Sequence, residues 1–81
     1  MNIEHNLTTK RFFIELEGGT DAELKYRLMD DNSVDFYSTF VPNTHRGQGI
    51  ASALVKTGIA WAKEQNYDMH ASCWYARKHL A

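Results

Sequence analysis

The chain has 81 residues and a formal net charge of −1, with 43% hydrophobic and 23% charged residues. A chain of this length can bury only one small core, which excludes a two-domain enzyme and a TIM barrel. Its ten aromatic residues exclude a disordered chain, and its single cysteine excludes an internal disulfide framework.

The N-terminal segment predicts a cytoplasmic protein without membrane contact. Met1–His5 lacks the basic and apolar pattern of a secretory signal, and the sequence contains no run of about 18 apolar residues. Residues 1–9 are polar, so we expect a loose segment or a short edge strand there, ahead of a single domain formed by residues 10–81. The four histidines have no metal-ligand spacing, and we expect no metal.

Three strands are predicted in the first half of the chain. Residues 11–17 and 22–28 alternate apolar and polar side chains, and residues 34–41 are rich in β-branched and aromatic side chains. Turn-forming residues separate the segments, which favours antiparallel pairing. We expect the outward acids of the first strand to lie opposite the outward bases of the second.

The hydrophobic period changes in the second half. Residues 49–65 place their apolar side chains, including Trp61, within one helical arc, and Asn66 is suited to a left-handed C-cap. Residues 67–73 predict a fourth strand, and residues 74–80 one or two helical turns. The order β-β-β-α-β-(α) predicts an α+β fold in which the strands on either side of the helix are parallel neighbours.

Charge is distributed unevenly between the two halves. Residues 1–41 carry four basic and eight acidic residues, net −4, whereas residues 42–81 carry five basic and two acidic residues, net +3. This asymmetry favours an anionic ligand in the second half, although a chance split is the simpler alternative. Lys56 and Lys63 lie on the polar face of the predicted helix without interleaved aromatic residues, so we expect no nucleic acid partner.

The segment between the third strand and the helix predicts an anion site. Pro42 ends the strand, and Gly47 and Gly49 allow backbone N–H groups to approach a ligand closely. The first turn of a helix has four N–H groups without internal partners, and its dipole favours a phosphate. Arg46 adds a full positive charge. The alternative is a loop in which the glycines only shape a turn and Arg46 is solvated.

This segment resembles a known family motif. Arg46-Gly47-Gln48-Gly49-Ile50-Ala51 is similar to the Arg/Gln-x-x-Gly-x-Gly/Ala motif of the GNAT acetyltransferase superfamily. Residues 10–80 as a whole resemble its small single-domain group, through Phe12-Phe13-Ile14, Leu24-Lys25-Tyr26-Arg27, Thr39-Phe40-Val41-Pro42 and Ser72-Cys73-Trp74-Tyr75. The resemblance implies a minimal GNAT fold, with antiparallel strands and a parallel pair beside the loop and helix.

The resemblance also implies a substrate and a set of binding residues. It implies an N-acetyltransferase that binds acetyl-CoA and passes the acetyl group to an unidentified amine in a ternary complex. The backbone of Gly47 to Ala51 would hold the pyrophosphate, with Arg46 and Gln48 beside it. The backbones of Phe40 and Val41 would bind the pantetheine arm, and the Val41 N–H would stabilise the oxyanion. The thioester would lie between these residues and the Ala71–Cys73 segment.

Two residues after the helix are candidates for catalysis. Cys73 is an acyl acceptor or a proton donor to the CoA thiolate, with Arg77 or Lys78 lowering its pKa, or else a small residue packed beside the coenzyme. Tyr75 is a proton donor to the departing thiolate or a packing aromatic.

The sequence departs from the family pattern where many members have a histidine before Thr39, because here that residue is Ser38. Asp35 and Tyr37, on the strand face opposite Phe36 and Phe40, are candidates for a base that acts through water, and His70, expected on the strand face opposite Cys73, is a further candidate for a general base. The absence of a clear base leaves two alternatives open, a non-catalytic CoA-binding module and a small interaction module. We expect a monomer or weak homodimer, with an acceptor side that is reduced or completed by another subunit.

Overall fold

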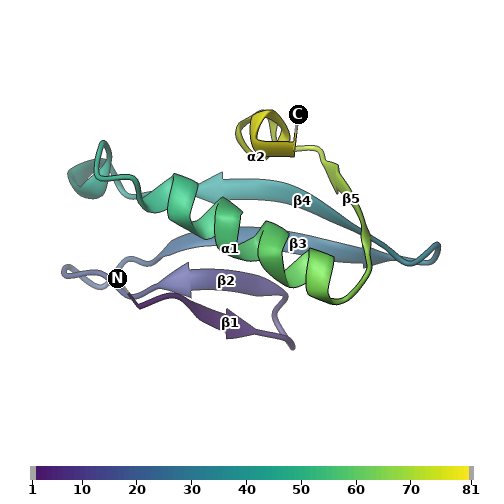
Figure 1. Ribbon diagram of the computed structural model, residues 1–81. Coiled ribbons are helices and arrows are strands. Elements are labelled where there is room, and N and C mark those ends of the chain that lie inside the picture. Colours follow the sequence, from purple (N-terminus) through teal and green to yellow (C-terminus); the bar gives the residue numbers. More distant parts are fainter. Residues whose placement is uncertain (1, 81) are drawn as a thin grey trace.

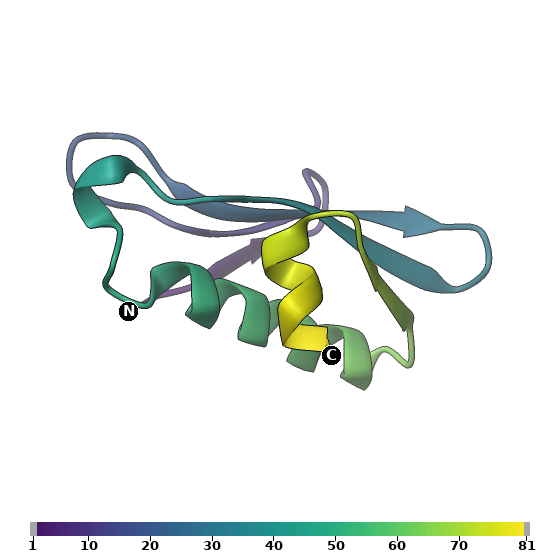
Figure 2. The same ribbon diagram turned by 90° about the horizontal axis from the view of Figure 1, so that it is seen from above.

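A computed structural model describes residues 2–80 and confirms the predicted α+β fold (Figure 1). The sheet has the strand order β1-β2-β3-β4-β5, and only β5 runs parallel to its neighbour. Both helices lie on the same face of this sheet (Figure 2). The elements, in chain order, are β1 (Glu4–Asn6), β2 (Arg11–Ile14), β3 (Ala22–Met29), β4 (Ser33–Phe40), the 3-10 turn η1 (Asn43–His45), α1 (Ile50–Glu64), β5 (Asp68–Ala71) and α2 (Trp74–Leu80).

The N-terminal segment contributes an edge strand, β1, which pairs antiparallel with β2. Its central residue, His5, turns into the core side of the sheet, where its ring stacks on Phe12 at 3.9 Å and meets Trp61 edge-on at 4.9 Å. The His5 Nε2 atom lies 2.6 Å from the Tyr26 hydroxyl. Of the two alternatives for residues 1–9, the short edge strand is therefore what Glu4–Asn6 form.

The expected charge pairing between the first two hairpin strands is wrong. β2 ends at Ile14, before the acids that were expected to face the bases of β3. Instead, the Arg11 guanidinium lies 2.8 Å from Glu23 Oε1 and 3.1 Å from Asp21 Oδ2. In these pairs the base belongs to β2, and the acids lie at the start of β3 and directly before it. The register places Phe13 opposite Glu23, and the Arg11 side chain, two residues before Phe13, reaches these acids.

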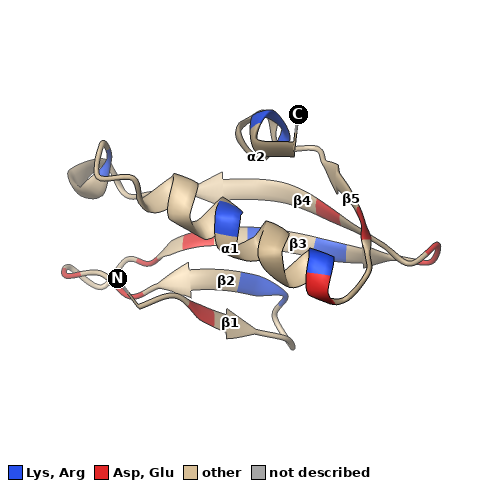
Figure 3. Cartoon of the chain, in the orientation of Figure 1, with Lys and Arg blue, Asp and Glu red and all other residues tan. Residues whose placement is uncertain are grey.

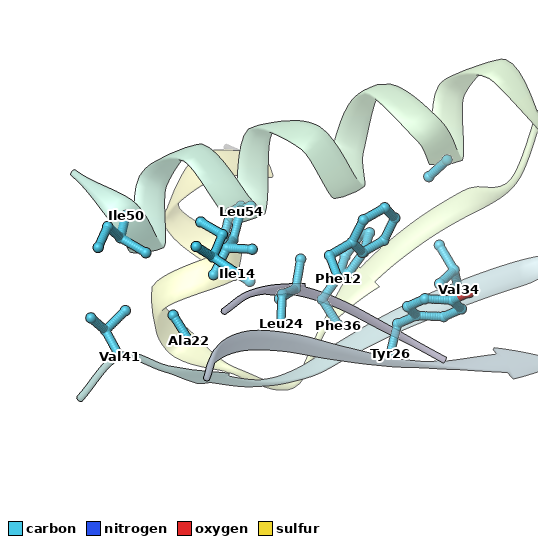
Figure 4. Packing of buried hydrophobic residues seen from close by; sticks show 13 residues of the cluster. Phe12, Ile14, Ala22, Leu24, Tyr26, Val34, Phe36, Val41, Ile50 and Leu54 are labelled. Carbon is cyan, nitrogen blue, oxygen red and sulfur yellow. The ribbon is translucent and has the colours of Figure 1, made fainter. Parts of the chain in front are cut away.

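The core lies between the sheet and α1, and its labelled side chains point at one another in Figure 4. Leu54 of α1 belongs to the same buried cluster as the sheet side chains Phe12, Leu24 and Phe36. Gly58 lies close against the sheet, because a Cβ atom there would lie 2.8 Å from Leu24 Cδ2 and 3.0 Å from Phe36 Cε1. The helix ends at Glu64, and Asn66, the residue predicted to adopt a left-handed conformation after it, has a φ of 60°.

A β-bulge on β4 changes which side chains face the core. Lys25 pairs with Ser38 and the next residue of β3, Tyr26, pairs with Phe36, so one β4 residue, Tyr37, has no partner of its own. Beyond the bulge Thr39 lies opposite buried Leu24 and turns toward the helices, whereas Phe40 turns outward and is 40% exposed. The expectation that Phe40 shares a face with Phe36 is therefore wrong, because the extra residue reverses the alternation.

The parallel pair of β4 and β5 is short. Its register runs from Ser33↔Asp68 to Phe36↔Ala71, as expected for strands joined through a helix. Beyond Phe36 the bulge directs β4 away from β5, and a gap opens between the two strands. Within residues 2–80, neither helix combines the length and the apolar character that a membrane span requires.

Candidate active site

The loop before α1 is built around two glycines in left-handed backbone conformation. Gly47 has a φ of 82° and Gly49, the N-cap of α1, has a φ of 78°. A Cβ atom at either glycine would meet nothing within 4 Å, so backbone conformation and open access, rather than crowding, account for glycine there. No side chain of the described residues caps α1 and its first turn has no acid, so the N–H groups of this turn have no side-chain partner among these residues.

Arg46 braces the loop against the end of β4. Its Nε atom donates a hydrogen bond of 3.0 Å to the Val41 carbonyl. The guanidinium is thereby held next to the strand end, and its terminal nitrogens have no partner among the described residues. The side chain is exposed, so these nitrogens are accessible to an anion.

A cleft of about 530 Å³ opens where β4 and β5 diverge. The end of β4, the glycine loop, the first turn of α1 and the start of α2 surround it. It brings together all the predicted site residues except Gln48, together with Thr39, His45 and Trp74. Its lining comprises Thr39, Phe40, Val41, His45, Arg46, Gly47, Gly49, Ile50, Ala51, Cys73, Trp74 and Tyr75.

Cys73 lies in this cleft, between β5 and α2. Its N–H donates to the Phe36 carbonyl at 3.2 Å, and its carbonyl accepts the first hydrogen bond of α2, from the Arg77 N–H at 3.0 Å. The thiol therefore projects from a backbone fixed on both sides. Its Sγ atom lies 3.5 Å from the Thr39 hydroxyl, across the gap between the strands.

The surroundings of Cys73 act on its thiol in opposite directions. The neutral thiol donates to the Thr39 hydroxyl. Burial raises the pKa of the thiol, but the hydrogen bonds that the Thr39 hydroxyl and the backbone N–H groups of Ala76, Tyr75 and Thr39 donate to the thiolate form outweigh it. The net pKa of the thiol is below the usual 9.0. The expected causes were Arg77 and Lys78. Instead, Arg77 donates to the Ala71 carbonyl, and the Lys78 ammonium stacks on the Tyr75 ring at 4.4 Å.

Two aromatic residues at the start of α2 form one wall of the cleft. Tyr75 is half-buried and its ring packs beside His79, 5.1 Å between ring centres. Trp74 is 72% exposed, and sequence reasoning did not place it in the site. Thr39 was also missed, although it belongs to the Thr-x-Val-Pro segment that carried the family resemblance, because only the bulge turns it toward Cys73.

The candidates for a general base lie outside the cleft. Asp35 accepts hydrogen bonds from the Ser72 N–H and hydroxyl, and its side chain is 9% exposed. Tyr37 is on the outer face, where the Arg27 guanidinium stacks on its ring. His70 lines a second hollow, on the other side of β5, together with Asp35.

Charge is arranged in space as it is along the sequence. Figure 3 shows Lys and Arg on the loop before α1, on both helices and on β2 and β3, while most acids lie on the strands and their connecting turns and one lies at the end of α1. The sequence has no acid between Asp35 and Glu64, a stretch that contains Arg46, Lys56 and Lys63. Among the described residues that line the cleft, none is Asp or Glu. The site therefore favours an anion.

The mixed sheet, with its parallel pair opening beside a glycine loop and a helix N-terminus, defines a GNAT-like fold. The sequence profile of the GCN5-related N-acetyl-transferase family matches residues 11–81, and the chain belongs to this family.

Known proteins agree with this assignment over nearly the whole chain. The protein NATD1 of Mus musculus and that of Homo sapiens are each 33% identical to it over 81 residues, which cover 99% of this chain and 74% and 72% of theirs. A solution structure of a GCN5-like protein from Staphylococcus aureus superposes with a TM-score of 0.74 at 31% identity, covering 98% of this chain and 76% of that one.

Proposed function

We propose that the cleft binds acetyl-CoA and that the protein transfers the acetyl group to an amine. The observation that carries this proposal is the position of Cys73, whose thiol shares one cleft with the uncapped start of α1 and its two left-handed glycines. A phosphate-binding element and a nucleophile in one cleft are the two parts that transfer from a CoA thioester through an acetyl-cysteine requires. Family membership supports the same reaction class.

The loop and helix would bind the pyrophosphate. Backbone N–H groups of Ile50 and Ala51 belong to the first turn, where the helix dipole adds partial positive charge. The terminal nitrogens of Arg46 provide a charge-assisted contact. The acid-free lining fits an anion, since it imposes no like-charge repulsion.

The diverging strands would bind the pantetheine arm. Beyond Phe36, β5 no longer covers the edge of β4, and strand edges bind extended groups through backbone hydrogen bonds. The amides of the pantetheine arm would pair with the backbones of Phe40 and Val41. In this arrangement the thioester lies near Cys73.

Cys73 is the group we assign to the first chemical step, in place of the direct attack by the amine in a ternary complex that the family resemblance implies. Its lowered pKa favours a thiolate, which suits a nucleophile better than a proton donor. The thiolate attacks the acetyl carbon, the Val41 N–H stabilises the oxyanion, and the bond to the CoA sulfur breaks. Tyr75, which lines the cleft, would donate its proton to the departing sulfur and regain one from water. An amine then attacks the Cys73 thioester, loses a proton to water and releases the Cys73 thiolate.

A non-catalytic CoA-binding module is the second candidate. Two observations favour it: both oxygens of Asp35 accept hydrogen bonds from Ser72, and the cleft lining has no carboxylate. Without a base, the amine would have to reach the cleft in its neutral form. In this case the protein would bind acetyl-CoA and turn it over with none of the amines.

The two candidates are separated by measuring binding and turnover in the same samples. Affinity for acetyl-CoA is measured by calorimetry, release of free CoA thiol is followed across polyamines, lysine peptides and peptide N-termini, and acetylation of Cys73 is read by mass spectrometry. We expect an acetyl adduct on Cys73 and thiol release that Cys73→Ala abolishes while changing the affinity less than about three-fold. Binding without turnover of any amine would select the module, and absence of binding would reject both.

A further inference from the structure

The least exposed carboxylate among the described ion pairs belongs to Asp35, on β4. Its Oδ1 atom accepts the Ser72 N–H at 2.8 Å and its Oδ2 atom accepts the Ser72 hydroxyl at 2.7 Å. Both contacts join residues 37 positions apart in the sequence. Asp35 therefore binds the backbone and the side chain of one residue, and that residue directly precedes Cys73.

These contacts occur where the sheet stops holding β5. The last register pair of the parallel strands is Phe36↔Ala71, and Ser72 is the first residue beyond it. The Asp35 carboxylate replaces the missing ladder contact at Ser72, and the Phe36 carbonyl accepts the N–H of Cys73 at 3.2 Å. Two consecutive residues of β4 thus fix two consecutive residues of the β5–α2 connection.

The other interpretations of Asp35 fit less well. A general base needs a carboxylate oxygen directed at the reacting groups, and both oxygens of Asp35 are engaged outside the cleft lining. A purely electrostatic pair with Arg27 is longer, at 3.4 Å, and the Arg27 side chain is 56% exposed. The short contacts of the buried carboxylate are those to Ser72, so its effect passes to the segment that carries Cys73.

We propose that Asp35 is a positioning residue that, through Ser72, holds the Cys73 thiol opposite Thr39 in the cleft. The inference builds on the proposed acyl transfer, in which this thiol is the nucleophile. Without the two contacts the connection between β5 and α2 is released at its first residue, and the thiol loses its fixed distance to the Thr39 hydroxyl. Asp35 then affects the reactivity of Cys73 while the loop that binds phosphate, on the other side of the cleft, is unchanged.

The test measures the alkylation of Cys73 by iodoacetamide as a function of pH in the free protein. Asp35→Ala removes both contacts, Ser72→Ala removes the hydroxyl contact alone, and Asp35→Asn retains an oxygen for the Ser72 N–H and a donor for its hydroxyl. Asp68→Ala, at an exposed carboxylate on β5, is the matched control. Thermal unfolding and acetyl-CoA affinity are measured for each variant.

We expect Asp35→Ala to slow alkylation about ten-fold at neutral pH and to move its pH profile upward, with acetyl-CoA affinity within about three-fold. We expect Ser72→Ala to slow it about three-fold, and Asp35→Asn and the control to retain more than half of the original rate. An unchanged rate and profile in Asp35→Ala would overturn the proposal. Equal losses of reactivity and affinity in Asp35→Ala and Asp35→Asn would also overturn it, since they indicate a general structural defect.

Two features keep the test decisive. If Asp35→Ala does not fold, the alkylation of Cys73 is compared between Ser72→Ala and the wild type instead. An unchanged pH profile of alkylation in Ser72→Ala then overturns the proposal. Because alkylation needs no acetyl-CoA, a wild-type protein that fails to bind acetyl-CoA refutes the proposed function separately from the effect of Asp35 on Cys73.

Discussion

The Thr39 hydroxyl and the Cys73 sulfur lie 3.5 Å apart across the gap between β4 and β5. Their proximity depends on the bulge, which turns Thr39 toward the helices, and on the parallel pair, which ends two residues before Cys73. A hydroxyl donor beside a sulfur favours its thiolate form, so the two residues form the reactive end of the cleft.

Thr39→Val should raise the pKa of the Cys73 thiol, because the substitution removes the side-chain hydrogen bond that offsets burial. The pH midpoint for alkylation of Cys73 should move upward, and the rate at neutral pH should fall. Ser38→Ala, at the neighbouring outward position, is the control and should retain the wild-type midpoint. An unchanged midpoint in Thr39→Val would show that the backbone N–H groups alone set the thiol pKa.

Gly49→Glu should weaken acetyl-CoA binding at least about a hundred-fold, because it strains a left-handed position and puts a carboxylate where a phosphate would bind. Gly18→Glu is the matched control. Gly18 has a φ of 92° and open space around it, in the turn between β2 and β3, and is not part of the cleft lining. Calorimetry on both variants distinguishes ligand repulsion from backbone strain, and equal affinities would contradict the proposed phosphate position.

Gly58→Ala should destabilise the fold by about 1–3 kcal/mol, because the added methyl overlaps the Leu24 and Phe36 side chains of the sheet. Helix propensity alone predicts the opposite sign, with alanine better by about 1 kcal/mol. Ala60→Gly, on the exposed side of α1, isolates the propensity effect and should cost about 1 kcal/mol. Urea unfolding measures both, and a more stable Gly58→Ala variant would contradict the close packing.

Acidification should weaken the fold through His5. Burial lowers the pKa of His5 below its usual 6.5, so the folded state disfavours the protonated ring. The unfolded chain binds more protons, hence the free energy of unfolding is highest above pH 6.5 and decreases as the pH falls through the folded-state pKa. Urea titrations should show this decrease reduced in His5→Gln and retained in His45→Gln, whose ring lies in the loop before α1. If the free energy of unfolding of His5→Gln depends on pH as that of the wild type does, His5 does not cause the weakening of the fold by acid.

Most of the fold could be predicted from the sequence, because each element carries its own period. Alternation marks β2 and β3, the helical arc marks α1, and Pro42 and Asn66 mark ends that the structure confirms. The order of elements alone implies the parallel pair. The strand β1 was left open between two alternatives, because a three-residue strand is too short for a pattern and His5 reads as a polar residue.

The interior of the cleft was less predictable because it depends on contacts distant in sequence. The bulge at Tyr37 leaves no mark in the composition of β4, yet it reverses Thr39 and Phe40. The contact of Asp35 with Ser72 likewise requires the parallel register, so the sequence presented Asp35 as an outward strand residue and a candidate base, not as a partner of Ser72. The glycine loop was predictable because its function depends on a local motif.

The central claim is most directly tested by titrating acetyl-CoA into the isotope-labelled protein and following its backbone amides by NMR. We predict saturable shifts concentrated at Val41, Gly47, Gly49, Ile50 and Cys73, with Gly18 and Gly19 in the distant turn unchanged. Absence of shifts at millimolar acetyl-CoA, or shifts confined to residues outside the cleft, would contradict the account.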